Sequence, residues 1–364
     1  MPKILFVATV PEHFRYFHLP CFKMLQEHGY EVHTVCGKAE AFPYTDKQFV
    51  IPIGRSPFDP HNVKGLRQLQ KIIREGQYDI IHAHTPTGGA LARIAAVHAR
   101  KSGTRVLYTA HGFHFYKGAS LLNWFVLFPV EWILSFLTDT ILTINTEDYG
   151  LAQKRLHAKR TVYIHGVGCD TAQYRRADEE ERAATRAEWG VGPDDPLLVY
   201  VAELNENKHQ DLLIRAVTAL QSDYPRLRLL LVGPDHIGGV YMRLTLQQHA
   251  PVIFTGERHD IPRILACCDM YAASSLREGL PVNIMEAMAA GLPVVAMRNR
   301  GHCALVQDGE TGFLVDTQSQ MEEKLCLLLD DAALRQTLGE NAKAHVADFD
   351  VRRVLKELEA VYFQ

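Results

Sequence analysis

Several features that mark common functional classes are missing from this chain of 364 residues. The first expected strand, Lys3–Val10, is not followed by Gly-x-Gly-x-x-Gly, so the dinucleotide-binding fingerprint is absent. The seven cysteines include no Cys-x-x-Cys pair, so a zinc site is not indicated and a reducing, cytoplasmic compartment is favoured. No basic run with interleaved aromatic residues occurs, which argues against nucleic acid as a partner.

Long apolar runs are also missing. The most apolar region, Leu121 to Leu137, is interrupted by Asn123, Pro129 and Glu131, and it falls short of the roughly 20 apolar residues that a membrane span needs. The segment Met1 to Val10 has one lysine and no small-residue cleavage site, so we expect a strand there and no signal peptide.

The charges are unevenly distributed over a chain that is long enough for two domains. Residues 1–168 contain 19 Lys and Arg against 12 Asp and Glu, whereas residues 169–364 contain 20 against 30. Twelve of the 18 histidines also lie in the first part. This asymmetry indicates that the first part faces something anionic, such as a membrane surface or a phosphorylated acceptor.

The apolar pattern predicts an α/β fold with two doubly wound, Rossmann-like domains. Near the N-terminus, a buried strand at Lys3–Val10, a helix at Phe14–His28 and a strand at Glu31–Cys36 form an opening βαβ unit. The same rhythm predicts further strands at Tyr78–Ala83, Arg105–Thr109, Thr140–Asn145, Val162–Gly168, Leu197–Val201, Leu227–Val232, Val252–Thr255, Met270–Ala273 and Pro293–Met297.

The most informative stretch is Ser274 to Ala296, which predicts a loop, a helix and a buried strand. Gly279, Leu280 and Pro281 precede the expected helix, whose free N–H groups and partial positive charge suit a phosphate. Glu278 and Glu286 lie eight positions apart on either side of this turn. Because an acid among the mostly apolar neighbours of Glu286 needs a partner or a role, a binding site is favoured over two surface acids.

The stretch resembles the E-x7-E motif of the retaining glycosyltransferases of family 4, embedded here in E-G-L-P-x-x-x-x-E-A-M-A-x-G-x-P-V-V. Three further segments occur in the order expected for this family: Thr109-Ala110-His111-Gly112, Gly168-Cys169-Asp170 and Lys208. The resemblance therefore covers nearly the whole chain. The segments TAHGFHFYKG and ELNENK are similar to those of the family members that build capsular and exopolysaccharide repeat units.

The resemblance implies a GT-B architecture, in which two domains face each other across a cleft. It implies an acceptor domain at 1–168, a nucleotide-sugar donor domain at 169–345, and a C-terminal helix at 346–364 that crosses back to the first domain. The expected enzyme is a metal-independent hexosyl- or N-acetylhexosaminyltransferase without a cofactor. It would move a sugar from a nucleotide diphosphate donor, UDP-linked by expectation, to a glycan or lipid-linked acceptor, in the cytoplasm or at the inner face of the cell membrane. The oligomeric state stays open.

The resemblance also assigns roles to single residues. Charge grows on the leaving diphosphate during transfer, so positive groups aimed there should supply most of the rate. The implied catalytic residues are His111, Lys208 and Glu278, with Lys208 at the diphosphate and the other two near the donor sugar. The implied donor-binding residues are Arg258, Gly279, Leu280, Pro281 and Glu286, with Glu286 on the ribose hydroxyls and Arg258 near the base through its side chain or backbone. No Asp-x-Asp motif lies at an expected strand end, and no metal ligand is expected.

One position departs from the family. Glu203 stands where many members carry an arginine on the diphosphate. Three explanations stay open: Glu203 orients Lys208, another cation such as Arg277 or Arg15 completes the phosphate site, or the donor site is tuned differently. Two rival functions also remain, a nucleotide-sugar 2-epimerase and a non-catalytic nucleotide-sugar binding subunit.

Two regions of the first domain carry weaker predictions. The loop after the first strand contains Glu12, His13 and Arg15. In one interpretation these residues contact the acceptor or a phosphate, and in the other they form a solvated loop. His84, like His111, follows a strand and is expected at the ligand-binding edge of the sheet. The aromatic residues of Leu121–Leu137 are core in one interpretation and a bilayer-docking surface for a lipid-linked acceptor in the other.

Overall fold

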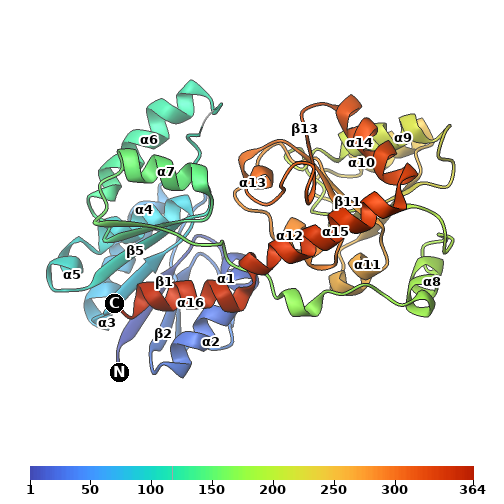
Figure 1. Cartoon of the computed structure of the whole chain (residues 1–364). Helices are drawn as coiled ribbons and strands as arrows, with labels where there is room; N and C mark the ends of the chain where they lie inside the picture. Colours follow the sequence, from blue (N-terminus) through green and yellow to red (C-terminus); the bar gives the residue numbers. More distant parts are fainter. Residues whose placement is uncertain (117) are drawn as a thin grey trace. The chain divides into compact units, whose positions relative to one another are not determined.

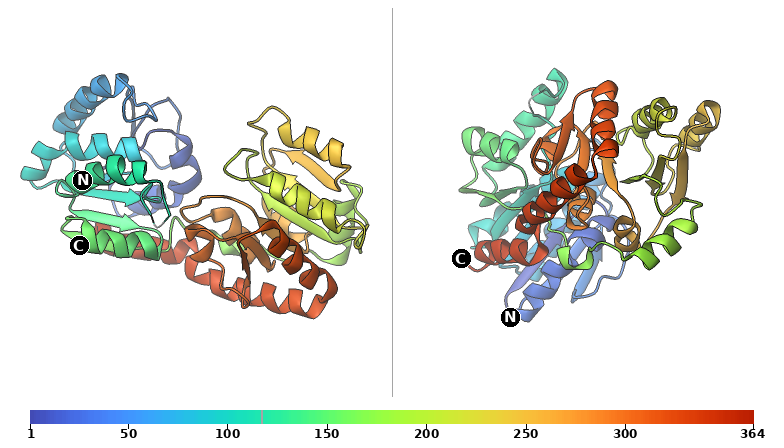
Figure 2. Two further views of the ribbon diagram at one scale, coloured as in Figure 1. Left: turned by 90° about the horizontal axis from the view of Figure 1, so that it is seen from above. Right: turned by 45° about the vertical axis from the view of Figure 1, so that its right-hand side comes forward.

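The computed structural model describes residues 1–116 and 118–364, and it divides them into two compact units. The first unit contains Met1–Gly168 together with Val351–Gln364, and the second contains Cys169–Asp350. Lys117, inside the segment TAHGFHFYKG, lies outside the described residues. Each unit is a parallel sheet with helices on both faces (Figures 1 and 2), so the predicted α/β fold with two doubly wound domains is confirmed.

The first sheet contains seven parallel strands. In spatial order they are β3 (Lys47–Val50), β2 (Glu31–Cys36), β1 (Lys3–Val7), β4 (Ile80–Ala83), β5 (Arg105–Ala110), β6 (Thr140–Thr143) and β7 (Arg160–Tyr163). After Lys3, the central strand β1 is a run of apolar residues that are buried on both faces of the sheet, as a parallel strand covered by helices requires. Leu5 and Val7 belong to one core cluster, while Phe6 packs on Phe22 at the other face.

The helices of the first unit are α1 (Glu12–Phe17), α2 (Leu19–Glu27), α3 (His61–Gly76), α4 (Pro86–Ala95), α5 (Val97–Lys101), α6 (Leu121–Ser135), α7 (Thr146–Arg155) and α16 (Val351–Tyr362). The single helix predicted at Phe14–His28 is wrong, because the helix breaks at His18 into α1 and α2. Pro20 explains the break, since its ring disfavours a regular helical backbone in the residues before it.

The second sheet contains six parallel strands. In spatial order they are β10 (Val252–Gly256), β9 (Arg228–Val232), β8 (Leu197–Val201), β11 (Met270–Ala273), β12 (Val294–Met297) and β13 (Gly312–Val315). The helices are α8 (Glu179–Ala187), α9 (Gln210–Leu220), α10 (Val240–Gln248), α11 (Ile261–Ala266), α12 (Val282–Ala289), α13 (Arg300–Cys303), α14 (Gln318–Asp330) and α15 (Ala332–Val346), with short 3-10 turns at Thr171–Gln173 and Ala347–Phe349.

Each sheet has a point at which the strand order reverses. In the first sheet the chain runs outward from β1 through β2 to β3 and then returns to β4 on the other side of β1. In the second sheet it runs from β8 through β9 to β10 and returns to β11 beside β8. Ligands of open α/β sheets bind at the carboxyl ends of the strands at such a reversal. The fold therefore directs attention to the loops after β1 and β4, and to those after β8 and β11.

The last helix, α16, packs against α2 in the first unit. The Tyr362 hydroxyl contacts His82 Nδ1 at 2.6 Å, and the Arg105 guanidinium donates to the Tyr362 carbonyl at 2.8 Å. These contacts fix the helix to β4 and β5. The predicted return of the C-terminal helix to the first domain is thus seen within this unit, and it begins at Val351.

Candidate active site

Lys208 lies in the loop after β8, at the strand reversal of the second sheet. Its backbone N–H donates to Asn205 Oδ1 at 2.9 Å, and its carbonyl accepts from Ser274 Oγ at 2.8 Å. The next residue, His209, has φ 53°, and this left-handed backbone turns the loop into α9. Lys208 is therefore held between the loops that follow β8 and β11.

The side chain of Lys208 meets that of Glu278, with Nζ 2.6 Å from Oε1. Both side chains are largely buried, at 18% and 14% exposure. The two loops are joined beside this pair as well, because Leu276 N–H donates to the Asn207 carbonyl at 2.8 Å and Asn207 Nδ2 donates to the Arg277 carbonyl at 3.1 Å. Two of the three predicted catalytic side chains, 70 positions apart in sequence, thus form one charged contact.

The loop after β12 closes the other side of Glu278. Asn299 caps α13 and donates through Nδ2 to the Ser275 carbonyl at 2.9 Å. A Cβ atom added to Gly301 would lie 2.6 Å from Glu278 Cβ, so only glycine permits this approach. His302 is buried next to them, and burial lowers its pKa to about 4. The Glu278 side chain is therefore positioned by packing as well as by its ion pair.

The N-terminus of α12 completes the charged region. Gly279, Leu280 and Pro281 lead into the helix directly after Glu278, as the sequence predicts. Asn283 Nδ2 donates to the Val201 carbonyl at 2.7 Å, which ties the first turn of α12 to the end of β8. The first N–H groups of a helix have no partner within it, and they give its N-terminus a partial positive charge. A positive side chain and a helix N-terminus are both groups that attract anions, so a phosphate site here stays a prediction.

Glu286 lies one turn into α12, and its Oε1 accepts from the Tyr174 hydroxyl at 2.8 Å. Burial raises the pKa of Glu286, while the Tyr174 hydrogen bond lowers it by stabilising the ionised form. The other carboxylate oxygen, Oε2, has no hydrogen bond to any part of the chain that the structure describes. This oxygen is free to accept from a ligand hydroxyl.

Arg258 is not part of this contact. It follows β10, which β9 and β8 separate from β11, and its guanidinium forms two bonds of 2.8 and 2.7 Å to its neighbour Asp260. Those hydrogen bonds raise the pKa of Arg258 and engage its side chain. A contact to a nucleotide base through the Arg258 backbone stays a prediction.

The explanation that Glu203 orients Lys208 stays a prediction, because Glu203 binds Asn205, whose Oδ1 accepts from the Lys208 backbone N–H at 2.9 Å. Glu203 Oε1 accepts from Asn205 Nδ2 at 2.9 Å, and Oε2 lies 3.3 Å from His236 Nε2, on an exposed part of the loop. Arg277 remains as a neighbouring cation, because its guanidinium forms no ion pair within residues 1–116 and 118–364. Arg15 belongs to the first unit, where Glu40 binds it through two bonds of 2.5 Å.

His111 lies in the first unit, after β5, and its Nε2 is 3.1 Å from His84 Nδ1. Burial lowers its pKa to about 4, so the imidazole is neutral at neutral pH. His13 is half-buried in α1, and its ring lies edge-on to His111 at 4.5 Å, so the interpretation of His13 as part of a solvated loop is wrong. His18 at the α1–α2 break joins this group of rings, 4.2 Å from His84.

Sequence reasoning missed several residues that build the site. Tyr174 and Gly301 gave no signal, because neither lies in the E-x7-E stretch, and Asn207 stood in the quoted ELNENK segment without a role. His18 was hidden inside an expected helix. Pro20 was the available sign that this helix is broken and that His18 occupies a loop-like position.

Comparison with known proteins agrees with the fold and the motif. The family model for glycosyl transferases group 1 matches residues 181–345, and that for glycosyl transferase 4-like domains matches residues 3–145. A Bacillus subtilis (strain 168) protein named "Putative glycosyltransferase EpsD" is 44% identical over 99% of this chain and 96% of its own length. An Escherichia coli UDP-Gal:alpha-D-GlcNAc-diphosphoundecaprenol alpha-1,3-galactosyltransferase is 24% identical, over 94% of this chain and 91% of its own length.

Solved structures show the same fold. Anabaena Alr3699/HepE in complex with UDP and glucose superimposes with a TM-score of 0.80 at 22% identity, and the match covers 99% of both chains. Sucrose-phosphate synthase from Thermosynechococcus elongatus gives a TM-score of 0.83 at 19% identity over 100% of this chain and 99% of its own. With the family models and the 44% identical relative, these findings show that the chain belongs to the group 1, family 4-like glycosyltransferases of GT-B fold.

Proposed function

We propose that the protein transfers a hexose or N-acetylhexosamine from a UDP-linked donor to a lipid-linked saccharide, with retention at the anomeric carbon, during exopolysaccharide synthesis. The contact between Lys208 and Glu278 beside the N-terminus of α12 carries this proposal. The named substrates of related proteins support it. The HepE structure holds UDP and glucose, and the Escherichia coli relative acts on a diphosphoundecaprenol-linked acceptor.

In the proposed reaction, Lys208 and the first N–H groups of α12 stabilise the negative charge that grows on the leaving diphosphate. These groups are fixed before the donor arrives, and such preorganised charges are the most effective form of electrostatic catalysis. Glu278 holds the ammonium in place, and the diphosphate then takes over part of that interaction. We propose that these two sources of positive charge replace a divalent cation at the diphosphate.

Glu286 is the proposed ribose ligand. Its unoccupied oxygen can accept from a hydroxyl while Tyr174 keeps the carboxylate oriented and favours its ionised form. We also propose that His111 hydrogen-bonds the donor sugar as a neutral imidazole.

A peripheral position on an anionic membrane fits the surface of α6. Leu122, Phe125 and Ile133 recur on one side of this helix and are 70%, 76% and 58% exposed, whereas Trp124 and Phe128 pack against the core. The only charged residue of α6, Glu131, is buried. No helix in the described residues is long and apolar enough to span a bilayer. We propose that α6 lies on the lipid surface and brings the enzyme to a lipid-linked acceptor.

A two-step experiment tests this function. Thermal stabilisation by a set of nucleotide diphosphate sugars identifies the donor, because a ligand that binds the native state raises its melting temperature. The selected donor is then incubated with and without a polyprenyl diphosphate saccharide. Acceptor-dependent release of UDP with an α-linked product supports the proposal. An epimer formed from the donor alone supports the epimerase, and saturable binding without transfer or hydrolysis supports the binding subunit.

A further inference from the structure

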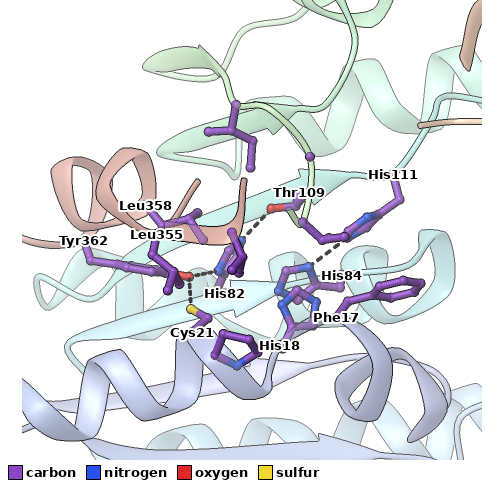
Figure 3. A pocket seen from close by; sticks show the side chains of 15 residues that line it. Phe17, His18, Cys21, His82, His84, Thr109, His111, Leu355, Leu358 and Tyr362 are labelled. Carbon is purple, nitrogen blue, oxygen red and sulfur yellow. Dashed lines mark hydrogen bonds between the residues drawn. The ribbon is translucent and has the colours of Figure 1, made fainter. Parts of the chain in front are cut away.

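Four histidines of the first unit form a compact cluster, which we call the histidine cluster: His13, His18, His84 and His111. One ring nitrogen from each lies within 4.8 Å of the others. They come from three segments, the α1–α2 region, the end of β4 and the end of β5, which meet at the strand reversal of the first sheet. Figure 3 shows three of these histidines, His18, His84 and His111, with the rings grouped together.

The cluster contains buried nitrogens that lack hydrogen-bond partners. Within the described residues, four buried side-chain nitrogens have none, and three of them are Nε2 of His13, His18 and His84. The neighbouring His82 differs, because its Nδ1 contacts the Tyr362 hydroxyl at 2.6 Å and its Nε2 contacts Thr109 Oγ1 at 2.8 Å (Figure 3). Buried polar atoms are normally paired, so three unpaired nitrogens in one cluster indicate a missing ligand.

A small cavity adjoins the cluster. It has a volume of roughly 20 Å³, and its walls include His18, His84 and His111. That volume admits one particle the size of a water molecule. The rest of the wall is mostly apolar, with Cys21 and Leu358 among its residues, so an organic substrate has no room in it.

The protonation state of the cluster suits a metal ion. Burial lowers the pKa of His13, His18 and His84 well below its ordinary value, and the neighbouring histidines lower it further. All four rings are therefore neutral at pH 7, which is the form that coordinates metals. Neutral imidazole nitrogen is a preferred ligand of Zn²⁺, Co²⁺, Ni²⁺ and Cu²⁺, whereas Mg²⁺ and Ca²⁺ prefer oxygen.

We propose that His13, His18, His84 and His111 bind one transition-metal ion, with Zn²⁺ as the natural candidate. All four ligands belong to the first unit, and neither Lys208 nor Glu278 is among them. His111 would offer Nε2 to the metal and keep Nδ1 for the hydrogen bond to the donor sugar that we propose above. Coordination replaces the His84–His111 hydrogen bond. It also requires the four nitrogens to approach one another by up to about 1.5 Å, because tetrahedral zinc holds nitrogen at roughly 2.0–2.1 Å.

The test uses the full chain, made without a polyhistidine tag and stripped with a chelator. Co²⁺ is titrated into the protein, and tetrahedral cobalt reports itself through visible absorption bands. We expect one equivalent of Co²⁺ to bind, Zn²⁺ to displace it, and Mg²⁺ to leave it in place. His18→Gln and His84→Gln should weaken binding by more than the roughly 10–100-fold that loss of an outer-shell partner costs. His61→Gln, which changes an exposed histidine of the same unit, should bind as the native chain does.

X-ray absorption on the native protein loaded with Zn²⁺ gives a result that does not depend on how the variants fold. Four imidazole nitrogens around the metal support the proposal, and a shell of oxygens contradicts it. The proposal is also overturned if no Co²⁺ binds at one equivalent, or if folded His18→Gln and His84→Gln proteins bind it as tightly as His61→Gln. In those cases the unpaired nitrogens form hydrogen bonds to water instead of binding a metal ion.

Discussion

The Lys208 ammonium lies 2.6 Å from the Glu278 carboxylate, where the loops after β8 and β11 meet. The pair gives each charge a partner in a largely buried place, and Glu278 lies in the segment that leads directly into α12. A donor diphosphate carries more charge than one carboxylate, so it can displace Glu278 as the main partner of Lys208. The account of catalysis rests on this exchange.

Replacing Gly301 with alanine should disturb the pair by crowding Glu278. The new methyl group would lie 2.6 Å from Glu278 Cβ and would push the carboxylate away from Lys208. We expect kcat/KM to fall roughly 10–100-fold, because small misplacements of catalytic groups have large effects on rate. The value of kcat/KM is measured from steady-state UDP release. Gly150→Ala is the matched control, since a Cβ there meets nothing within 4 Å; equal effects of both changes would refute the packing role of Gly301.

Removing the Tyr174 hydroxyl should change how donor binding depends on pH. Burial raises the pKa of Glu286, and the Tyr174 hydrogen bond opposes that rise. In Tyr174→Phe burial acts unopposed, so the pKa rises further and the carboxylate is protonated at higher pH. The acid limb of UDP affinity should therefore move to higher pH, as measured by calorimetry across a pH series. Tyr224→Phe, which removes a similar bond to exposed Asp330, should leave the profile unchanged. An unshifted profile in Tyr174→Phe would contradict the role of Glu286 as a nucleotide ligand.

Breaking the buried pair of Arg93 and Glu131 should strongly destabilise the first unit. Arg93 is fully buried, forms two hydrogen bonds to Glu131, and lies 3.9 Å above the Tyr108 ring. Glu131→Gln leaves a buried guanidinium without its counter-charge, and we expect a loss of about 3–5 kcal/mol in the free energy of unfolding.

Urea denaturation checks this stability prediction. Glu75→Gln breaks the exposed Lys71–Glu75 pair and should change stability by less than about 0.5 kcal/mol. If the two variants lose similar amounts of unfolding free energy, breaking the buried Arg93 pair costs no more than breaking an exposed pair.

The exposed side of α6 should bind lipid. Leu122→Ser and Phe125→Ser together remove two highly exposed apolar side chains without touching the core, so folding should be unaffected. We expect the native chain to sediment with vesicles that contain anionic lipid, and the double variant to remain largely in the supernatant. Substituting Leu246, an equally exposed apolar residue of α10, by serine serves as control. If the double variant still binds vesicles, the membrane contact lies on another part of the protein.

Much of the fold follows from short apolar runs. Met270–Ala273 is an uninterrupted apolar run, and the structure places β11 at those residues. The edge strand β3 (Lys47–Val50) gave no signal, because it is mostly exposed and contains Lys47 and Gln48. The last strand, β13 (Gly312–Val315), is only four residues long and begins with glycine. Such strands are specified by their neighbours in the sheet more than by their own sequence.

The site was predictable in part for a similar reason. The motif indicated that Lys208 and Glu278 belong to one site, but only the order of the strands brings residues 70 positions apart into contact. The role of Glu203 could not be settled from sequence, because it depends on which way a loop side chain points. The histidine cluster could not be predicted from the sequence. It depends on the break in the helix at His18 and on the parallel register of β1, β4 and β5.

The most direct test of the central claim is the turnover of Lys208→Ala with the identified donor and acceptor. The account predicts a fall in kcat of roughly 10²–10³-fold, as expected when a charge aimed at the developing anion is removed. Circular dichroism should show the native fold, with a lower melting temperature because the largely buried Glu278 loses its partner. Lys324→Ala, at a surface lysine of the same unit, should keep full activity. If folded Lys208→Ala turns over at the native rate, Lys208 does not stabilise the leaving diphosphate and the proposed mechanism is wrong.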